Sequence, residues 1–261
     1  MSDILVLAFL FAMGSSLGWC LEVVYRRLSP ANESRKWINP GFLAGPYLPL
    51  YGFGLVALYL MAGIEDAYFV QQAQAGGRIM LFAAMAVVMT GLEYIAGLIF
   101  IKGMKIQLWD YSREKFNLQG IICPRFSVYW ACLGAVYYFL IHPHIIEAVM
   151  WLSENITFSF FIGMFYGVFI VDLVRSLGIV TKMRTFAKEN EILIRYEEFK
   201  EQVRQSAAER MQKPHWLLQF RSDIPIKEHL AKYFDLQNAF FMKDIEEKFK
   251  GKNKEIKNKT I

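Results

Sequence analysis

Three carboxylates within long apolar stretches are the residues of this chain best suited to chemistry. Glu22, Glu93 and Asp172 each lie towards the end of such a stretch. Because a carboxylate inside a membrane span is costly and usually faces a partner or a cavity, several together could hold a cation, meet an amine or a basic headgroup, or relay protons. An alternative interpretation of Glu22 is an ion pair with Arg26, four residues on. For Asp172 the alternative is an ion pair with Arg175 at the membrane boundary.

A segment rich in proline and glycine, residues 39–54, leads into one of the apolar stretches. It reads NPGFLAGPYLPLYGFG, with three prolines and four glycines in sixteen positions. Proline lacks an amide donor and glycine tolerates strained backbone, so this is not an ordinary helix start. In hydrocarbon, irregular backbone survives only where protein or a water-filled cavity satisfies its polar groups. We therefore expect a re-entrant or broken helix entrance that lines a site, with the candidate residues Asn39, Gly41, Pro46 and Tyr51.

A second segment with related spacing, residues 108–130, reads LWDYSREKFNLQGIICPRFSVYW. An ungapped match aligns an asparagine, a proline and a tyrosine of the two segments, and each segment follows a stretch that bears a late glutamate. This pattern predicts two degenerate two-helix repeats, and transport folds place sites at repeat interfaces. The matched pairs are Asn39 with Asn117, Pro46 with Pro124, and Tyr51 with Tyr129.

The second segment adds its own candidate pocket residues, which are Trp109, Asp110, Tyr111 and Asn117. Aromatic residues at a span boundary also suit the interface between water and lipid. Trp109, Tyr111 and Trp130 could therefore form an aromatic belt, which is the alternative interpretation.

Apolar stretches near twenty residues long recur through the 261-residue chain, which is 55% hydrophobic and 16% aromatic. This is the length that a helix needs to cross about 30 Å of hydrocarbon. We predict about five spans, and the first is interpreted as a span because it lacks the basic region and cleavage site of a signal peptide. The predicted spans are residues 4–25, 42–64, 79–101, 121–141 and 158–177.

Basic residues cluster after the first, third and fifth predicted spans, whereas the other connections carry acidic residues and histidines. The positive-inside rule then places the N terminus outside and the C terminus in the cytoplasm. All candidate residues fall in the cytoplasmic half, which predicts a polar, aromatic-lined pocket open to the cytoplasmic leaflet. The net charge of +5 fits contact with anionic lipid and does not require nucleic acid.

The predicted fold class is an all-α, polytopic membrane protein with a helical cytoplasmic tail. The tail lacks a phosphate-binding glycine loop, so an ATPase would be a separate chain. Three cysteines without CxxC spacing indicate packing residues, and no cofactor or catalytic residue is indicated. The expected divisions are a transmembrane domain at residues 1–178, an amphipathic helical tail at 179–250 and a disordered lysine-rich end at 251–261.

Four motifs stand out in the first half of the chain, and they are GWCLE (18–22), NPGFLAGPYLPLYG (39–52), EY (93–94) and WDYS followed by NLQG (109–120). Together they resemble the motifs of a bacterial membrane protein family, the CmpB-like proteins described as putative ABC-transporter type IV. Members usually carry an arginine where Pro40 stands here, which weakens any role for a charge at that position. The resemblance implies a permease-like role in a bacterial cytoplasmic membrane.

Three function hypotheses follow from these features. The first is a permease-like protein whose pocket handles a small or lipidic solute, with a separate ATPase chain or a homo-oligomer as its assembly. The second is a membrane-embedded enzyme that acts on lipid headgroups, with Glu22, Glu93 and Asp110 as metal ligands or as acid and base. The third is a scaffold that recruits partners through its tail.

Overall fold

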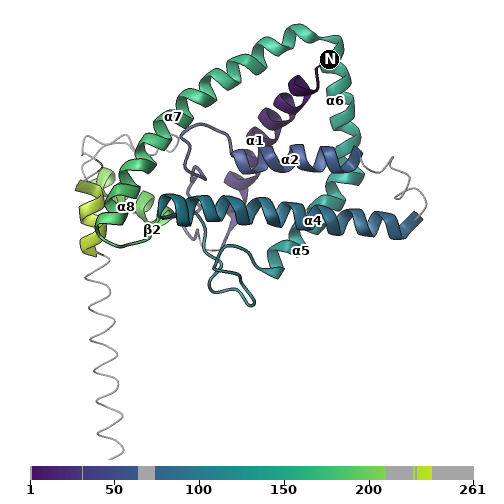
Figure 1. Cartoon of the computed structure of the whole chain (residues 1–261). Helices are drawn as coiled ribbons and strands as arrows, with labels where there is room; N and C mark the ends of the chain where they lie inside the picture. Colours follow the sequence, from purple (N-terminus) through teal and green to yellow (C-terminus); the bar gives the residue numbers. More distant parts are fainter. Residues whose placement is uncertain (1, 31, 64–73, 210–225, 227, 237–261) are drawn as a thin grey trace, which may run out of the picture.

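The computed structural model of the protein describes residues 2–30, 32–63, 74–209, 226 and 228–236 (Figure 1). Helices dominate these residues, and the two strands among them have two residues each. Four helical stretches are long and apolar enough to cross a membrane, which confirms the predicted all-α, polytopic class. These stretches are Asp3–Leu28, Gly76–Gly103, Pro124–Glu154 and Ile156–Glu189.

The first helix pair consists of one long and one short helix. Helix α1, Asp3–Leu28, has 26 residues, whereas α2, Pro49–Ala62, has 14. At 1.5 Å per residue α2 is about 21 Å long, less than the hydrocarbon thickness of about 30 Å. Proline at the first helical position explains why α2 begins at residue 49 rather than 42, since its fixed φ suits a helix start. The residues before it form the irregular helix entrance.

Glycines allow α1 and α2 to pack closely. A Cβ atom added at Gly18 would fall on the side chain of Tyr51, and one at Gly14 would lie 2.7 Å from Cβ of Leu55. Small residues at such contacts let helices approach each other in a membrane. On α7, Ser159–Glu189, by contrast, a Cβ atom at Gly163 would meet nothing within 4 Å.

Replacing Gly18 by alanine is expected to destabilise the protein by about 2 kcal/mol, because the new methyl group overpacks against Tyr51. The measurement is the thermal stability of the purified protein, which is monitored by size-exclusion chromatography after heating. Gly163→Ala is the matched control and is expected to leave stability unchanged or to raise it slightly, because alanine favours a helix interior. Equal melting temperatures for both variants would contradict the close packing of α1 on α2.

The second helix pair contains two π-helical turns. The turn η2 extends α4, and the turn η3 joins α5 to α6 without a break, so one continuous helical stretch runs beyond the predicted span end at residue 141. The α5 start resembles that of α2, with proline in the first helical turn. The bounds are Gln74–Leu98 for α4, Ile99–Gly103 for η2, Pro124–Val136 for α5, Tyr137–Ile141 for η3 and His142–Glu154 for α6.

Helix α7, Ser159–Glu189, follows the short 3₁₀ turn η4, Ile156–Phe158, and crosses residue 178 without interruption. Its far end packs in a hydrophobic cluster with a two-stranded parallel sheet and helix α8. The strands are β1, Ile106–Gln107, and β2, Ile194–Arg195, and α8 spans Tyr196–Glu209.

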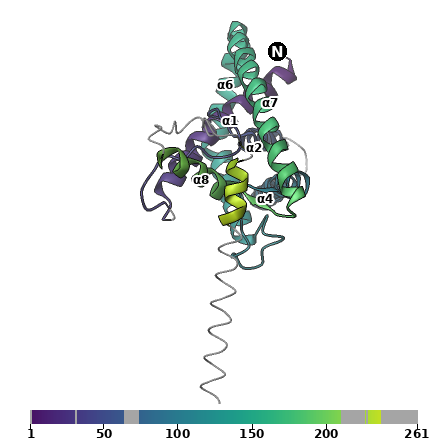
Figure 2. The same ribbon diagram turned by 90° about the vertical axis from the view of Figure 1, so that its left-hand side faces the viewer.

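Residues 228–236 are helical and lie beside α8 at the same end of the molecule (Figure 2). The cluster there includes Met183, Ile194, Phe199 and Leu230. The division of the chain at residue 178 and the extent of the tail stay predictions. The predicted disordered end, residues 251–261, lies outside the described residues.

Candidate functional site

Glu22 lies near the end of α1 and has two polar partners there. The hydroxyl of Tyr51, on α2, donates to Oε2 of Glu22 at 2.9 Å, and Nε of Arg26 donates to Oε1 at 2.8 Å. The local ion pair with Arg26 is therefore present. The carboxylate charge of Glu22 is compensated within the chain by this guanidinium.

Asn39 shapes the irregular segment before α2. The residue is 3% exposed, and its side chain accepts from Nε1 of Trp19 at 2.6 Å and donates to the carbonyl of Ala44 at 3.0 Å. Gly41 follows with a φ of +73°, a conformation that glycine adopts without a Cβ penalty. These contacts make Asn39 and Gly41 determinants of the loop backbone.

Asp172 on α7 binds the same loop, from far along the sequence. Its carboxylate accepts from the amide of Gly45 at 2.9 Å, from the amide of Ala44 at 3.4 Å and from the hydroxyl of Tyr47 at 2.8 Å. Burial, together with Asp172, raises the pKa of the Tyr47 hydroxyl. Arg175 is exposed, and the ion pairs found among the described residues do not join it to Asp172. The carboxylate therefore serves as a cap for the loop. Pro46 lies exposed within that loop.

Glu93 lies in α4 and is the most deeply buried of the three candidate carboxylates, with 4% of the residue exposed. The hydroxyl of Tyr111 donates to Oε1 at 2.9 Å, and Nε1 of Trp130 donates to Oε2 at 3.0 Å. Both donors are neutral, and the ion pairs found among the described residues do not include Glu93. Its charge is therefore held by hydrogen bonds without a cation.

The Glu22 and Glu93 clusters lie near enough for their charges to interact. Burial and the charge of Glu93 raise the pKa of the Tyr111 hydroxyl, and the charge of Glu22 adds to this effect. Each glutamate also accepts a hydrogen bond from a tyrosine hydroxyl at 2.9 Å. The two helix pairs thus bring the same chemical pair, glutamate and tyrosine, to neighbouring positions.

The loop between η2 and α5 is held by its own side chains. Nε1 of Trp109 donates to the carbonyl of Ile121 at 2.9 Å, and the Asn117 amide donates to the carbonyl of Glu114 at 2.8 Å. The amide of Gly120, where φ is +68°, donates to Oδ1 of Asn117 at 3.0 Å. Trp109 and Asn117 therefore position the loop that carries Tyr111.

Asp110 belongs to this loop and faces a different set of partners. Its Oδ1 accepts from the amide of Ser112 at 2.9 Å, and its Oδ2 lies 3.8 Å from Arg195 on β2. Partial burial raises the pKa of the Asp110 carboxyl, but the hydrogen bonds from Ser112 and the charge of Arg195 outweigh it and lower the pKa. These contacts do not join Asp110 to either glutamate, so it acts as a turn residue and as a link to the C-terminal cluster.

Helix α8 packs directly on the loop that Asn39 shapes. Oε1 of Glu197 lies 3.0 Å from Nη1 of Arg26 and 3.0 Å from Nζ of Lys200. The Lys200 ammonium also donates to the backbone carbonyl of Asn39 at 3.0 Å. Burial lowers the pKa of Lys200, and Glu197 partly offsets that shift. A row of charged groups therefore connects Glu22 on α1 to α8.

The structural register of the two helix pairs differs from the ungapped sequence match. Helix α2 begins at Pro49 and α5 at Pro124, so the helix starts align three residues away from the match of Pro46 with Pro124. In this register Tyr51 corresponds to Phe126, whose ring stacks on Tyr111 at 4.3 Å.

Sequence reasoning missed several members of this site. Trp130 was expected only in an interfacial belt, yet its indole donates to Glu93. The donors Trp19 and Lys200 and the acceptor Glu197 were not predicted, because each is joined to its partner by tertiary packing. The motif GWCLE already contained Trp19 beside Glu22, which was the available signal.

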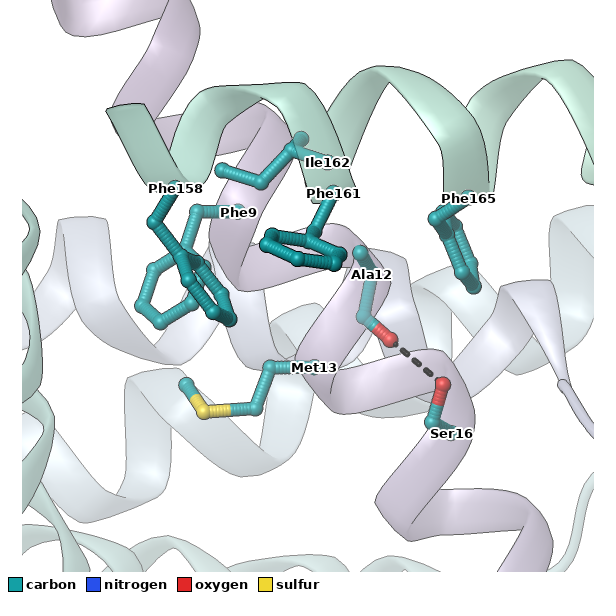
Figure 3. A pocket seen from close by; sticks show the side chains of 8 residues that line it. All are labelled: Phe9, Ala12, Met13, Ser16, Phe158, Phe161, Ile162 and Phe165. Atoms are coloured by element: carbon teal, nitrogen blue, oxygen red, sulfur yellow. Dashed lines mark hydrogen bonds between the residues drawn. The ribbon is translucent and has the colours of Figure 1, made fainter. Parts of the chain in front are cut away.

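A cavity of about 190 Å³ lies elsewhere, between α1 and α7 (Figure 3). Its lining is apolar and aromatic, and Ser16, its polar member, donates its hydroxyl to the carbonyl of Ala12 at 2.9 Å. None of the predicted pocket residues lines it. Within the described ranges, no group of three or more histidine, cysteine or acidic side chains could hold a metal ion. The lining residues are Phe9, Ala12, Met13, Ser16, Phe158, Phe161, Ile162 and Phe165.

Comparison with known proteins gives a family for the transmembrane part. The family model described as Putative ABC-transporter type IV matches residues 9–177, which is more than half of the chain. No curated protein and no solved structure matches the chain. The matched segment contains every candidate residue from Glu22 to Arg175 and ends before α8.

Proposed function

Because the chain belongs to the family described as Putative ABC-transporter type IV, we propose that it is the permease-like component of a membrane transport system. Family membership and the apolar helices indicate a transport-related membrane protein. We further propose a bacterial cytoplasmic membrane with the N terminus outside, as the distribution of basic residues supports. An ATPase would then be a separate chain, and a homo-oligomer is the alternative assembly.

The proposed centre of transport is the polar region around Glu93 and Glu22, which opens to the cytoplasmic leaflet when the loop that carries Tyr111 moves. The observation that carries this proposal is the buried carboxylate of Glu93, whose donors Tyr111 and Trp130 are both neutral. A buried charge without a cationic partner is costly, and intramembrane carboxylates of this kind mark solute or proton pathways. The solute is therefore a small or lipidic molecule with a cationic group, or it moves together with a proton.

The remaining candidates have supporting roles in this proposal. Glu22 is neutralised by Arg26 and adds a polar wall beside Glu93. Asn39 and Asp172 fix the loop before α2. Tyr111 covers Glu93 from the loop between η2 and α5. Access to Glu93 requires the Tyr111 hydroxyl to leave its carboxylate, so this loop is the element that we expect to move.

The test compares cells that lack the protein with cells that carry it. Membrane lipids and the small molecules of cells and medium are measured in both. We expect at least one solute or lipid, either cationic or moved together with a proton, to change its distribution without chemical alteration. A lipid with a chemically altered headgroup would instead support the enzyme alternative, and identical profiles would contradict transport.

A further inference from the structure

The tip of the loop between η2 and α5 presents a large apolar side chain to the surroundings. Phe116 is 89% exposed, and Leu118, two residues on, is 49% exposed. The backbone at Phe116 has a φ of +56°, which is uncommon for a residue with a side chain. Asn117 donates to the carbonyls of Ser112 and Glu114, so the tip has a defined shape. The loop therefore holds Phe116 outward instead of packing it against the protein.

An ion pair joins this tip to the start of helix α5. Oε1 of Glu114 lies 3.1 Å from Nη1 of Arg125, in the first turn of α5. Arg125 also donates to the hydroxyl of Tyr129 at 3.1 Å, and its guanidinium lies 5.8 Å from the centre of that ring. Exposed arginine and tyrosine at the end of a span occupy the headgroup level. In Figure 1 the tip projects beside the start of α5, which is the end of the helix where we expect the membrane boundary.

The charges around the tip determine which lipid headgroups it attracts. Arg113 and Lys115 precede Phe116 in the sequence, and both are exposed. The intervening Glu114 is paired with Arg125, so the tip is positive. Basic residues near a membrane surface bind anionic lipids, and each contributes measurably to the attraction.

We propose that residues 112–118 are an interfacial anchor for anionic phospholipid. Phe116 and Leu118 enter the outer part of the hydrocarbon, and Arg113 and Lys115 bind acidic headgroups. Two of the aromatic residues considered for the interface have partners inside the protein, since Tyr111 donates to Glu93 and Trp109 to the loop backbone. The assignment of the loop to the cytoplasmic leaflet rests on the orientation proposed above, but lipid binding itself does not.

Hydrogen–deuterium exchange of the full chain tests this anchor. The protein is placed in nanodiscs of phosphatidylcholine alone or of phosphatidylcholine mixed with phosphatidylglycerol. We expect slower exchange over residues 112–118 in the mixed lipid. In the double variant Arg113→Gln, Lys115→Gln this difference between the two lipids should disappear. Protection of residues 112–118 in the mixed lipid should fall by roughly tenfold. Phe116→Ser should speed exchange in both lipids.

Lys182→Gln on α7 is the control, because it removes an exposed basic residue from another part of the described chain. It should leave the loop's exchange unchanged. Equal exchange over residues 112–118 in the two lipids, or exchange indifferent to Phe116→Ser, would overturn the proposal. In that outcome the tip is free to contact a protein partner, such as a separate ATPase chain.

Discussion

Replacing Glu93 by glutamine is expected to remove transport while the protein still accumulates in the membrane. The amide keeps the size of the side chain and can still accept from Tyr111 or Trp130. It cannot carry the negative charge that we propose meets a cationic group or a proton. The measurement is the redistribution of the solute found by comparing cells with and without the protein, and we expect at least a tenfold loss, or about 1.4 kcal/mol.

Two further variants separate the charge of Glu93 from its surroundings. Tyr111→Phe removes one donor and should reduce transport less than Glu93→Gln does. Glu147→Gln, on α6, is the matched control, because Glu147 is exposed and its ion pair within the described part of the chain is the local one with His144 at 3.4 Å. Full transport by Glu93→Gln would remove Glu93 from the site.

Replacing Asp172 by alanine is expected to destabilise the protein by about 3 kcal/mol or more. The change leaves the amide of Gly45 and the hydroxyl of Tyr47 without their acceptor in a partly buried place. Each unsatisfied buried donor costs about 1–3 kcal/mol. Thermal unfolding of the purified protein provides the measurement, with a parallel determination of its level in membranes.

Arg175→Gln serves as the control for that variant, because Arg175 lies one turn away on the same helix and is exposed. It should unfold at the temperature of the unchanged protein. If Asp172→Ala were as stable as Arg175→Gln, the carboxylate would not be the element that holds the loop before α2.

The helical membrane architecture could be predicted from apolar stretches that match the membrane thickness. Two helix boundaries could not be predicted in this way. Residues 42–48 are as apolar as a span, yet Pro46 and Pro49 interrupt the backbone pattern there, and the helix begins only at Pro49. The sequence HPH at residues 142–144 resembles a turn. The chain instead continues as α6, since proline is accepted in a first helical turn and here follows the π-helical turn η3.

The candidate site was predictable where its residues share an element or a short loop. The pair of Glu22 and Arg26 is one helical turn apart, and asparagine before a glycine turn indicates a shaped loop. The bonds from Gly45 to Asp172 and from Asn39 to Lys200 were not predictable, because they join residues more than a hundred positions apart. Their geometry depends on how α7 and α8 pack, which local spacing does not encode.

Labelling with a hydrophobic carbodiimide tests the central claim most directly, because the reagent modifies carboxyl groups that take up a proton within the membrane. The full chain is treated in its native membrane, digested and examined by mass spectrometry at Glu93 and Glu22. A carboxylate held only by neutral donors should react, whereas one paired with Arg26 should react about tenfold less. We predict modification of Glu93 with Glu22 largely intact. Equal modification of the two, or an unreactive Glu93, would contradict the claim.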